Sequence, residues 1–242
     1  MKRHFCFSIS CKLWVVTREV FAISIEINWL YQTLLTHMGP SGWWPADDKR
    51  DIIVGAILVQ NTAWQNADVG LNNLKHRTRL DPEAVLALTQ TELIDLIRAS
   101  GFYRNKAKAI HSVFQWFNDR SWDYAGIATS ATQAELRKQL LALPGVGQET
   151  ADVYLVYIFD LPTFIADSYT RRLFKHLGYQ QTDSYQHLKK QVSLPSNFTA
   201  EMAQDFHGQL DEFGKQYLQR EDTFGDSFLA QELFEYQQTQ ES

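Results

Sequence analysis

The sequence predicts an all-α protein made of two helical domains. Apolar residues recur at helical spacing along the chain and almost nowhere alternate, which favours helices over strands. The 242 residues, of which 45% are hydrophobic and 21% charged, suffice for one or two globular domains with a sizeable core. Six prolines and twelve glycines are too few for a linker protein, and no segment recurs at a fixed period.

Each helix in the first half of the chain is predicted from a local pattern. Residues 52–64 and 82–98 are apolar enough to form buried helices. Thr132 and Glu135 have the spacing of a capping box, which marks the start of a further helix. Residues 105–118 carry one apolar stripe, formed by Ala107, Ile110, Phe114 and Phe117.

The second half continues in the same way. A helix over 148–160 ends before Pro162, and a helix over 168–177 ends before Gly178. The short intervals between helices fit two packed lobes. Residues 199–218 place five apolar side chains on one face: Met202, Phe206, Leu210, Phe213 and Tyr217.

Residues 1–25 are predicted to be an N-terminal extension. Lys2 and Arg3 precede an apolar run over 5–16 that resembles a secretion signal, but Lys12 interrupts it and no clear cleavage site follows. The run is also too short to span a bilayer. We therefore expect no membrane partner.

Charge is unevenly distributed along the chain. The net charge is −5, but residues 221–242 hold six acidic residues and no Lys or Arg, so residues 1–220 carry +1. Residues 221–242 are expected to form an acidic tail. Two basic segments, 101–120 and 171–176, could face phosphates, although ordinary solvated surface is the alternative.

Residues 143–152 predict a tight turn between two helices. Gly145 and Gly147 can take positive φ and leave room for the close approach of another backbone. Successive N–H groups at the start of the second helix, at its positive dipole end, form a phosphate site, often with a bound monovalent cation. The alternative is a plain hairpin in which the glycines only cap a helix.

The residues after this hairpin carry a family resemblance. The second helix closes at Asp160-Leu161-Pro162, and Ile165-Ala166-Asp167-Ser168-Tyr169 follows. This combination resembles the helix-hairpin-helix, Gly-Pro-Asp superfamily of DNA glycosylases, typified by endonuclease III. Residues 54–62, with Gln60, and residues 100–107 also resemble family segments, so the likeness covers about residues 37–215.

The resemblance implies how the domains are arranged. A barrel-like helical domain would span 51–161, and a second domain would combine 26–50 with 162–220. The active-site cleft between them would hold a flipped base. Gln60 would fill the gap that the base leaves in the DNA, or else it is a solvent-facing helix end.

Asp167 is the expected catalytic residue. An ionised carboxylate stabilises the oxocarbenium-like sugar as the base leaves, and it can orient a water. Asp167 also precedes a predicted helix as an N-cap would, and both roles can hold together. The nucleophilic lysine of bifunctional relatives lies 18 positions earlier, where this chain has Glu149. Since a carboxylate forms no Schiff base, the resemblance implies a monofunctional enzyme.

Cofactor expectations follow from the cysteines. Many relatives carry a four-cysteine cluster loop shortly after a His-Gly pair like His207-Gly208, but this chain has only Cys6 and Cys11. We therefore expect no iron–sulfur cluster, no structural metal and no required cofactor, apart from a monovalent cation at the hairpin. So few cysteines also favour a reducing, cytoplasmic compartment.

Aromatic residues suggest the substrate. Residues 37–46 and 61–64 resemble the cluster-free subgroup of the family that acts on 3-methyladenine, in which such aromatics line the base pocket. An alkylated purine is cationic and favours indole faces, although core packing is the alternative role for these rings. The expected base pocket consists of Trp43, Trp44, Pro45 and Trp64.

The expected partner is double-stranded DNA containing a damaged base, bound by a monomer. A glycosylase for oxidised pyrimidines or mispaired adenine, and a non-catalytic DNA-binding protein, remain alternatives. The acidic tail would repel non-specific DNA, dock on the body or stay disordered. Phosphate contacts are expected from Gly145, Val146, Gly147, Thr150, Arg104, Lys106 and Arg171.

Overall fold

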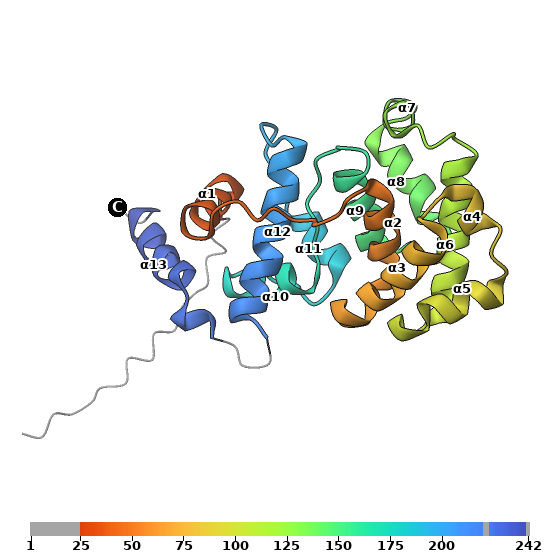
Figure 1. Cartoon of the computed structure of the whole chain (residues 1–242). Coiled ribbons are helices and arrows are strands. Elements are labelled where there is room, and N and C mark those ends of the chain that lie inside the picture. Colours follow the sequence, from red (N-terminus) through yellow and green to blue (C-terminus); the bar gives the residue numbers. More distant parts are fainter. Residues whose placement is uncertain (1–24, 220–222, 241–242) are drawn as a thin grey trace, which may run out of the picture.

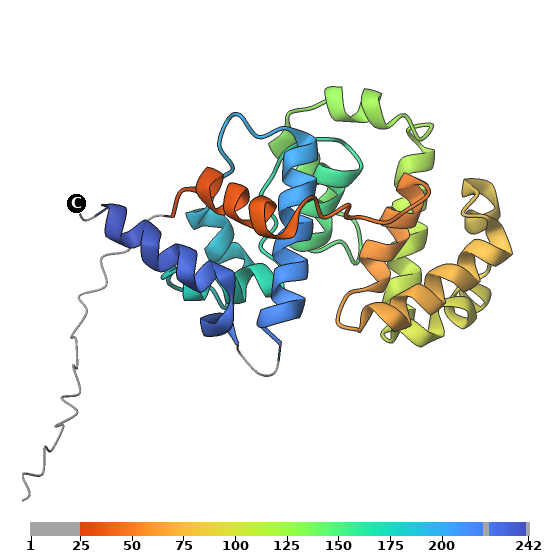
Figure 2. The ribbon, with the colours of Figure 1, turned by 60° about the vertical axis from the view of Figure 1, so that its left-hand side comes forward.

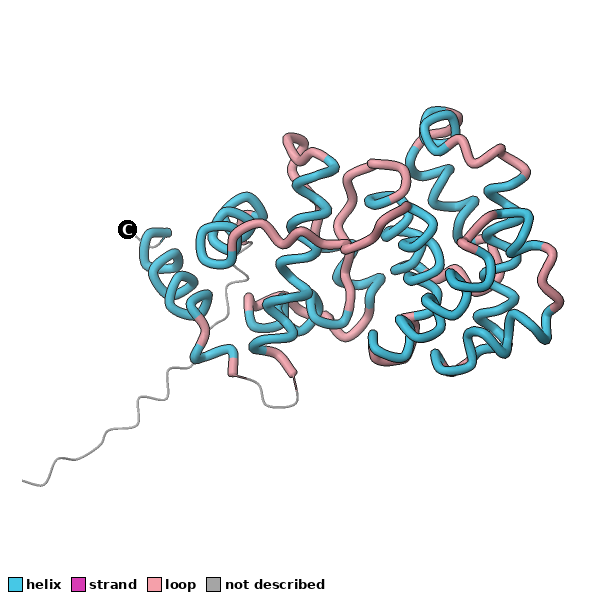
Figure 3. Tube along the Cα trace, viewed as in Figure 1, coloured by secondary structure: helices cyan, strands magenta, loops and turns pink. Residues whose placement is uncertain are grey.

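The computed structural model describes residues 25–219 and 223–240, and these residues form helices and loops without a β-strand (Figures 1 and 3). The predicted all-α class is therefore confirmed. The predicted extension over 1–25 lies almost entirely outside the described residues. The helices in the first half are α1 (Ile27–Met38), α2 (Lys49–Leu58), α3 (Trp64–Thr78), α4 (Pro82–Leu86), α5 (Gln90–Ile97), the 3₁₀ turn η1 (Arg98–Ser100) and α6 (Tyr103–Asn118).

The second half contains the hairpin and the helices that follow it. These are α7 (Tyr124–Thr129), α8 (Gln133–Leu141), α9 (Gln148–Tyr157), α10 (Ser168–His176), α11 (Tyr185–Gln191), α12 (Ala200–Tyr217), η2 (Phe224–Asp226) and α13 (Phe228–Gln240). Among these described helices, none has the length and apolar character needed to cross a bilayer.

Two hydrophobic clusters divide the molecule. One is built mainly from α2–α9, and the other combines α1 with α10–α13. Helix α1 therefore packs against α12 and α13, which follow it by more than 150 residues in the sequence (Figure 2). Helix α9 contacts α2 and α8 on one side and α11 and α12 on the other, so it lies where the clusters meet.

Two predicted helices have different bounds in the structure. The helix expected over 82–98 is two helices, because Thr89 accepts a hydrogen bond from the Glu92 N–H and forms a capping box that starts α5. The helix expected over 52–64 ends at Leu58, since Asn61 adopts a left-handed conformation with φ 53°. The capping box of Thr132 and Glu135 is present at the start of α8.

The C-terminal acidic segment is helical and docked on α1. The rings of Trp29 and Tyr236 lie 4.3 Å apart between centroids, and His37 stacks on Phe228 at 4.3 Å. His37 Nε2 also lies 2.8 Å from a Glu232 carboxylate oxygen. Of the three arrangements considered for this segment, the structure shows docking on the body.

Candidate active site

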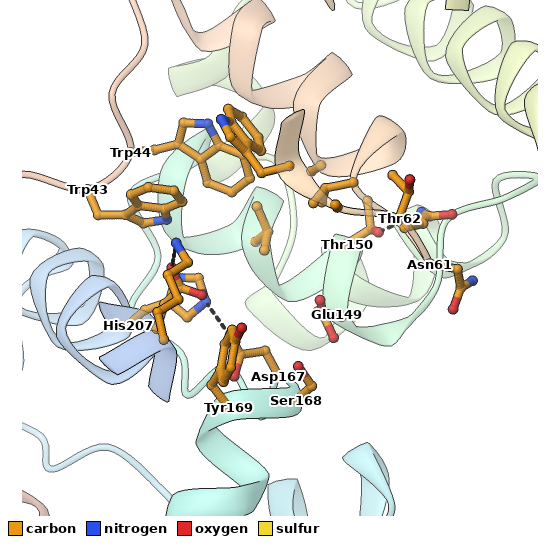
Figure 4. Close-up of a pocket in the computed structure, with 18 of the residues that line it drawn as sticks. Trp43, Trp44, Asn61, Thr62, Glu149, Thr150, Asp167, Ser168, Tyr169 and His207 are labelled. Carbon is orange, nitrogen blue, oxygen red and sulfur yellow. Dashed lines mark hydrogen bonds and ion pairs between the residues drawn. The ribbon is translucent and has the colours of Figure 1, made fainter. Parts of the chain in front are cut away.

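A cavity of about 810 Å³ opens where the two clusters meet (Figure 4). Its walls come from the segment before α2, the turn between α2 and α3, and helices α9, α10 and α12. Polar and aromatic side chains from segments far apart in the sequence thus face one space. The chemically distinctive lining residues are Trp43, Trp44, Trp64, Glu149, Asp167, His207, Asp211 and Lys215.

The position of Asp167 is fixed by the extended segment that precedes it. Ile165 is buried in the first hydrophobic cluster, whereas Phe164 and Ala166 are buried in the second. Successive side chains therefore anchor this segment in both clusters, as alternation along extended backbone allows. Asp167 follows directly, at the edge of the cavity.

Asp167 is both the N-cap of α10 and a cavity residue. Its Oδ1 accepts a hydrogen bond of 2.7 Å from the Thr170 N–H, and its Oδ2 lies 3.5 Å from His207 Nε2. Burial alone would raise the pKa of Asp167, but the interaction with His207 and the Thr170 N–H outweigh it and lower that pKa below its usual value. Asp167 is therefore ionised at neutral pH.

His207 is a contact that sequence reasoning missed. Its Nδ1 lies 2.8 Å from the Tyr157 hydroxyl, and this bond orients the ring so that Nε2 faces Asp167. The sequence marked His207-Gly208 only as the pair that precedes a cluster loop in relatives. The available signal was an isolated histidine on the apolar face of the predicted helix over 199–218.

Glu149 faces the same cavity from the second residue of α9. Figure 4 shows its carboxyl directed toward Asp167 and Ser168. Although the side chain is exposed in the cavity, the surrounding protein and then the charge of Asp167 raise the pKa of Glu149 to about 7.

Three tryptophan rings form the aromatic part of the lining. The centroids of Trp43 and Trp44 are 5.3 Å apart, and Trp64 lies 6.2 Å and 5.7 Å from them. Gly55 on α2 makes room for them, since a Cβ there would lie only 3.3 Å from the Trp44 ring. Pro45 was expected in this pocket, but it is exposed and does not line the cavity, because the chain turns outward there toward α2.

The hairpin turn has one glycine that its geometry requires. Gly145 has φ +77°, and a Cβ there would lie 2.5 Å from the Ala109 Cβ on α6. Gly147 has φ −87° and open space around it, so the positive φ expected for it is absent. The N–H groups of both glycines donate to no acceptor among the described residues.

Two other residues of the hairpin are already engaged. The Val146 N–H donates to the Leu143 carbonyl, so the expected phosphate contact from Val146 is not available. Thr150 is buried, and its hydroxyl accepts a hydrogen bond of 2.9 Å from Gln60 Nε2. Gln60 also donates to the Gly145 carbonyl at 3.1 Å, so the expected DNA wedge is docked on the hairpin rather than free in solvent.

The three basic side chains expected on phosphates lie in different environments. Arg104 is exposed, and Arg171 lines the cavity while donating to the Ala166 carbonyl. Lys106 is only 3% exposed, and its ammonium donates to the Leu58 and Ser100 carbonyls at 2.9 and 2.6 Å. The expected phosphate contact from Lys106 is therefore wrong, because this side chain ties the end of α2 to η1 inside the protein.

Metal-ligand geometry was considered in the same residues. Within 25–219 and 223–240, no group of three or more His, Cys, Asp or Glu side chains is placed to hold a metal ion. Both cysteines, Cys6 and Cys11, lie outside these ranges.

Comparisons with known proteins agree with this architecture. A family model for HhH-GPD superfamily base excision DNA repair proteins matches residues 54–196. A relative from Methanocaldococcus jannaschii, described as a candidate DNA repair glycosylase, is 34% identical over 195 residues, which are 79% of this chain and 88% of the relative. An endonuclease III from Thermotoga maritima is 26% identical over 168 residues, covering 69% and 74% of the two chains.

Solved structures give the same result. The H. pylori 3-methyladenine DNA glycosylase MagIII, bound to 1,N6-ethenoadenine, matches with a TM-score of 0.64 and 26% identity, over 78% of this chain and 97% of MagIII. A non-covalent complex of endonuclease III with DNA matches with a TM-score of 0.65 and 22% identity, over 83% and 90% of the two chains, which supports the fold.

Proposed function

The chain belongs to the HhH-GPD superfamily of base excision DNA repair proteins, and from this premise we propose that it is a DNA glycosylase for alkylated purines of the 3-methyladenine class. The enzyme would act as a monomer on double-stranded DNA and hydrolyse the N-glycosidic bond with water. The observation that carries the proposal is the cavity, in which the ionised Asp167 carboxylate and three indole rings face one space.

The proposed substrate preference follows from charge and shape. An alkylated purine is a cation, so it gains about 0.5–2 kcal/mol from an indole face and leaves as a neutral base. Asp167 would stabilise the positive sugar that forms as the C1′–N bond breaks. The match to a 3-methyladenine glycosylase over 97% of its length supports this choice of base.

The proposed absence of lyase activity depends on Glu149. Glu149 occupies the position that holds the nucleophilic lysine in bifunctional relatives, and it faces the cavity. A carboxylate cannot form a Schiff base with the sugar. Hydrolysis would therefore leave an intact abasic site.

The proposal includes no required cofactor. Two cysteines cannot ligate a four-cysteine cluster. At the hairpin, the free N–H groups of Gly145 and Gly147 would hold a DNA phosphate, with a monovalent cation nearby. Arg104, exposed just beyond η1, would contact the backbone without reading sequence.

The test uses alkylated duplex DNA, the wild-type protein and the Asp167→Asn variant. Released bases are identified by chromatography, and strand breaks are counted before and after hot alkali. We expect the wild type to release 3-methyladenine and to give breaks only after alkali. We expect Asp167→Asn to lose at least about 10²-fold in rate, because a neutral amide does not stabilise the sugar cation.

Other outcomes would redirect the proposal. Release of an oxidised pyrimidine or mispaired adenine instead would replace the substrate, and breaks before alkali would contradict the water-dependent reaction. If the protein binds DNA but releases no base, the enzymatic proposal is wrong and a DNA-binding role replaces it.

A further inference from the structure

Hydrolysis with water leaves one proton to be removed. As the water oxygen bonds to C1′, an O–H bond of that water must break, and a general base in the cavity lowers the barrier to this step. The cavity offers several acceptors, and their contacts separate them.

Asp167 is poorly suited to take this proton. One of its oxygens accepts the Thr170 N–H, and the other faces His207. These contacts hold its pKa below the usual value, which makes its carboxylate a weak base. The same contacts suit Asp167 to a different task, since an anion that stays ionised stabilises the sugar cation throughout the reaction.

The other acceptors are engaged with partners. His207 uses Nδ1 with Tyr157 and turns Nε2 toward Asp167. Asp211 forms an ion pair with Lys215, whose ammonium also lies 4.5 Å from the centre of the Trp43 ring. Neither group is free to receive a proton from a water at the sugar.

Glu149 differs from these groups. It lines the cavity, its carboxyl is directed toward Asp167 and Ser168 (Figure 4), and it has no hydrogen bond or ion pair among the described residues. From this geometry, and resting on the proposed function, we propose that Glu149 is the general base that deprotonates the attacking water.

The step balances without a further reactant. The C1′–N bond breaks and its electron pair leaves with the base, while the water oxygen forms the new C1′–O bond. The water proton passes to a Glu149 carboxylate oxygen and then to solvent. A division of labour between two carboxylates, one stabilising the cation and one activating water, also serves the inverting hydrolysis of sugars.

This role predicts a pH dependence. The charged and titratable groups that influence Glu149 are Asp167, His207, Arg171, Asp211 and Tyr185. With burial, Asp167 raises the pKa of Glu149 to about 7, near the value at which a base is most effective. Because the base acts in its ionised form, the rate should rise with pH up to about 7 and level off above it.

The experiment measures single-turnover release of a cationic base, 7-methylguanine, from duplex DNA between pH 5.5 and 8.5, after subtraction of the enzyme-free rate. We expect Glu149→Gln to slow release by about 10²-fold at pH 8 and to remove the rise with pH. Glu149→Asp should recover part of both. The matched control is Glu83→Gln, which alters a glutamate at the second residue of α4, away from the cavity, and should keep the wild-type profile.

Two further measurements separate catalysis from folding. The Tm of Glu149→Gln and its affinity for DNA with an abasic site should stay within about twofold of wild type in Kd, since the amide has nearly the shape of the carboxyl. A Glu149→Gln variant with the wild-type rate, or with the rise in rate through pH 7 intact, would overturn this assignment alone. No base release by the wild type would overturn the proposed function as well.

Discussion

At Asp167 one carboxylate satisfies the helix and the cavity together. The oxygen that caps α10 fixes the side chain, and the other oxygen is left at the cavity beside His207. An asparagine caps a helix about as well as an aspartate does. Loss of activity in Asp167→Asn would therefore report on the negative charge rather than on the stability of α10.

The residue at position 149 offers a direct test of the lysine position. Glu149→Lys would place an amine in the cavity at the start of α9. We expect this variant to form a covalent adduct with abasic-site DNA that borohydride traps, since a lysine attacks C1′ through a Schiff base. Trapping on a denaturing gel measures the effect.

The comparison needs a lysine elsewhere on the protein. Wild type already contains Lys108, which is exposed on α6, and Lys106, which is buried. Wild-type protein should therefore give no trapped adduct. An adduct of equal yield in wild type would show that another amine attacks the sugar, and the monofunctional proposal would fail.

Sequence reasoning reached the site residues unevenly. Asp167, Glu149 and the tryptophans were identified because a family resemblance places each at a position in a short motif. His207 contacts Asp167 across 40 residues, and no local spacing encodes that distance. Lys106 was misplaced because a positive charge indicates exposure on average, whereas here two backbone carbonyls satisfy its ammonium inside the protein.

At the scale of elements, the hairpin between α8 and α9 is held by the close approach of α6. Gly145→Ala would combine a left-handed φ of +77° with a contact of 2.5 Å to Ala109. We expect the free energy of unfolding to fall by about 2 kcal/mol, measured by urea denaturation. Gly147→Ala is the control, since its φ is negative and its surroundings are open, and it should lose under about 1 kcal/mol. Equal losses in both variants would contradict this account of the turn.

Element boundaries depended on side-chain hydrogen bonds more than on apolar spacing. Periodicity indicated apolar helical segments over 105–118 and 199–218, and α6 and α12 follow them closely. It failed over 82–98, where the apolar pattern continues through a chain break that Thr89 creates. Capping boxes at Thr89 and Thr132 have the same pattern, so reading every such pair would have found both helix starts.

At the scale of the whole molecule, α13 stabilises the fold from a position outside the active site. Leu229 is fully buried on α13, and no residue of this helix lines the cavity. Leu229→Ala should lower the free energy of unfolding by about 2–5 kcal/mol. The rate of base release, measured well below the Tm, should not change.

The matched control lies on the same helix. Phe234 is 59% exposed, so Phe234→Ala should change the free energy of unfolding by no more than about 0.5 kcal/mol. A large loss of activity in Leu229→Ala at a temperature where the variant is folded would link α13 to the site. The sequence favoured none of three arrangements for this segment, because docking depends on aromatic contacts with α1 that begin about 200 residues earlier.

The packing of α1 with the helices at the other end of the chain also sets the order in which the protein can be completed on the ribosome. Residues of the first cluster emerge together, but Leu30 and Leu34 of α1 must wait for α12 before they are buried. At translation rates of about 5–20 residues per second, the roughly 170 residues between them take on the order of 10–35 s. During that interval Asp167 also lacks His207. A nascent chain would thus carry the hairpin before it carries a complete site, and catalysis would begin only once synthesis is nearly finished.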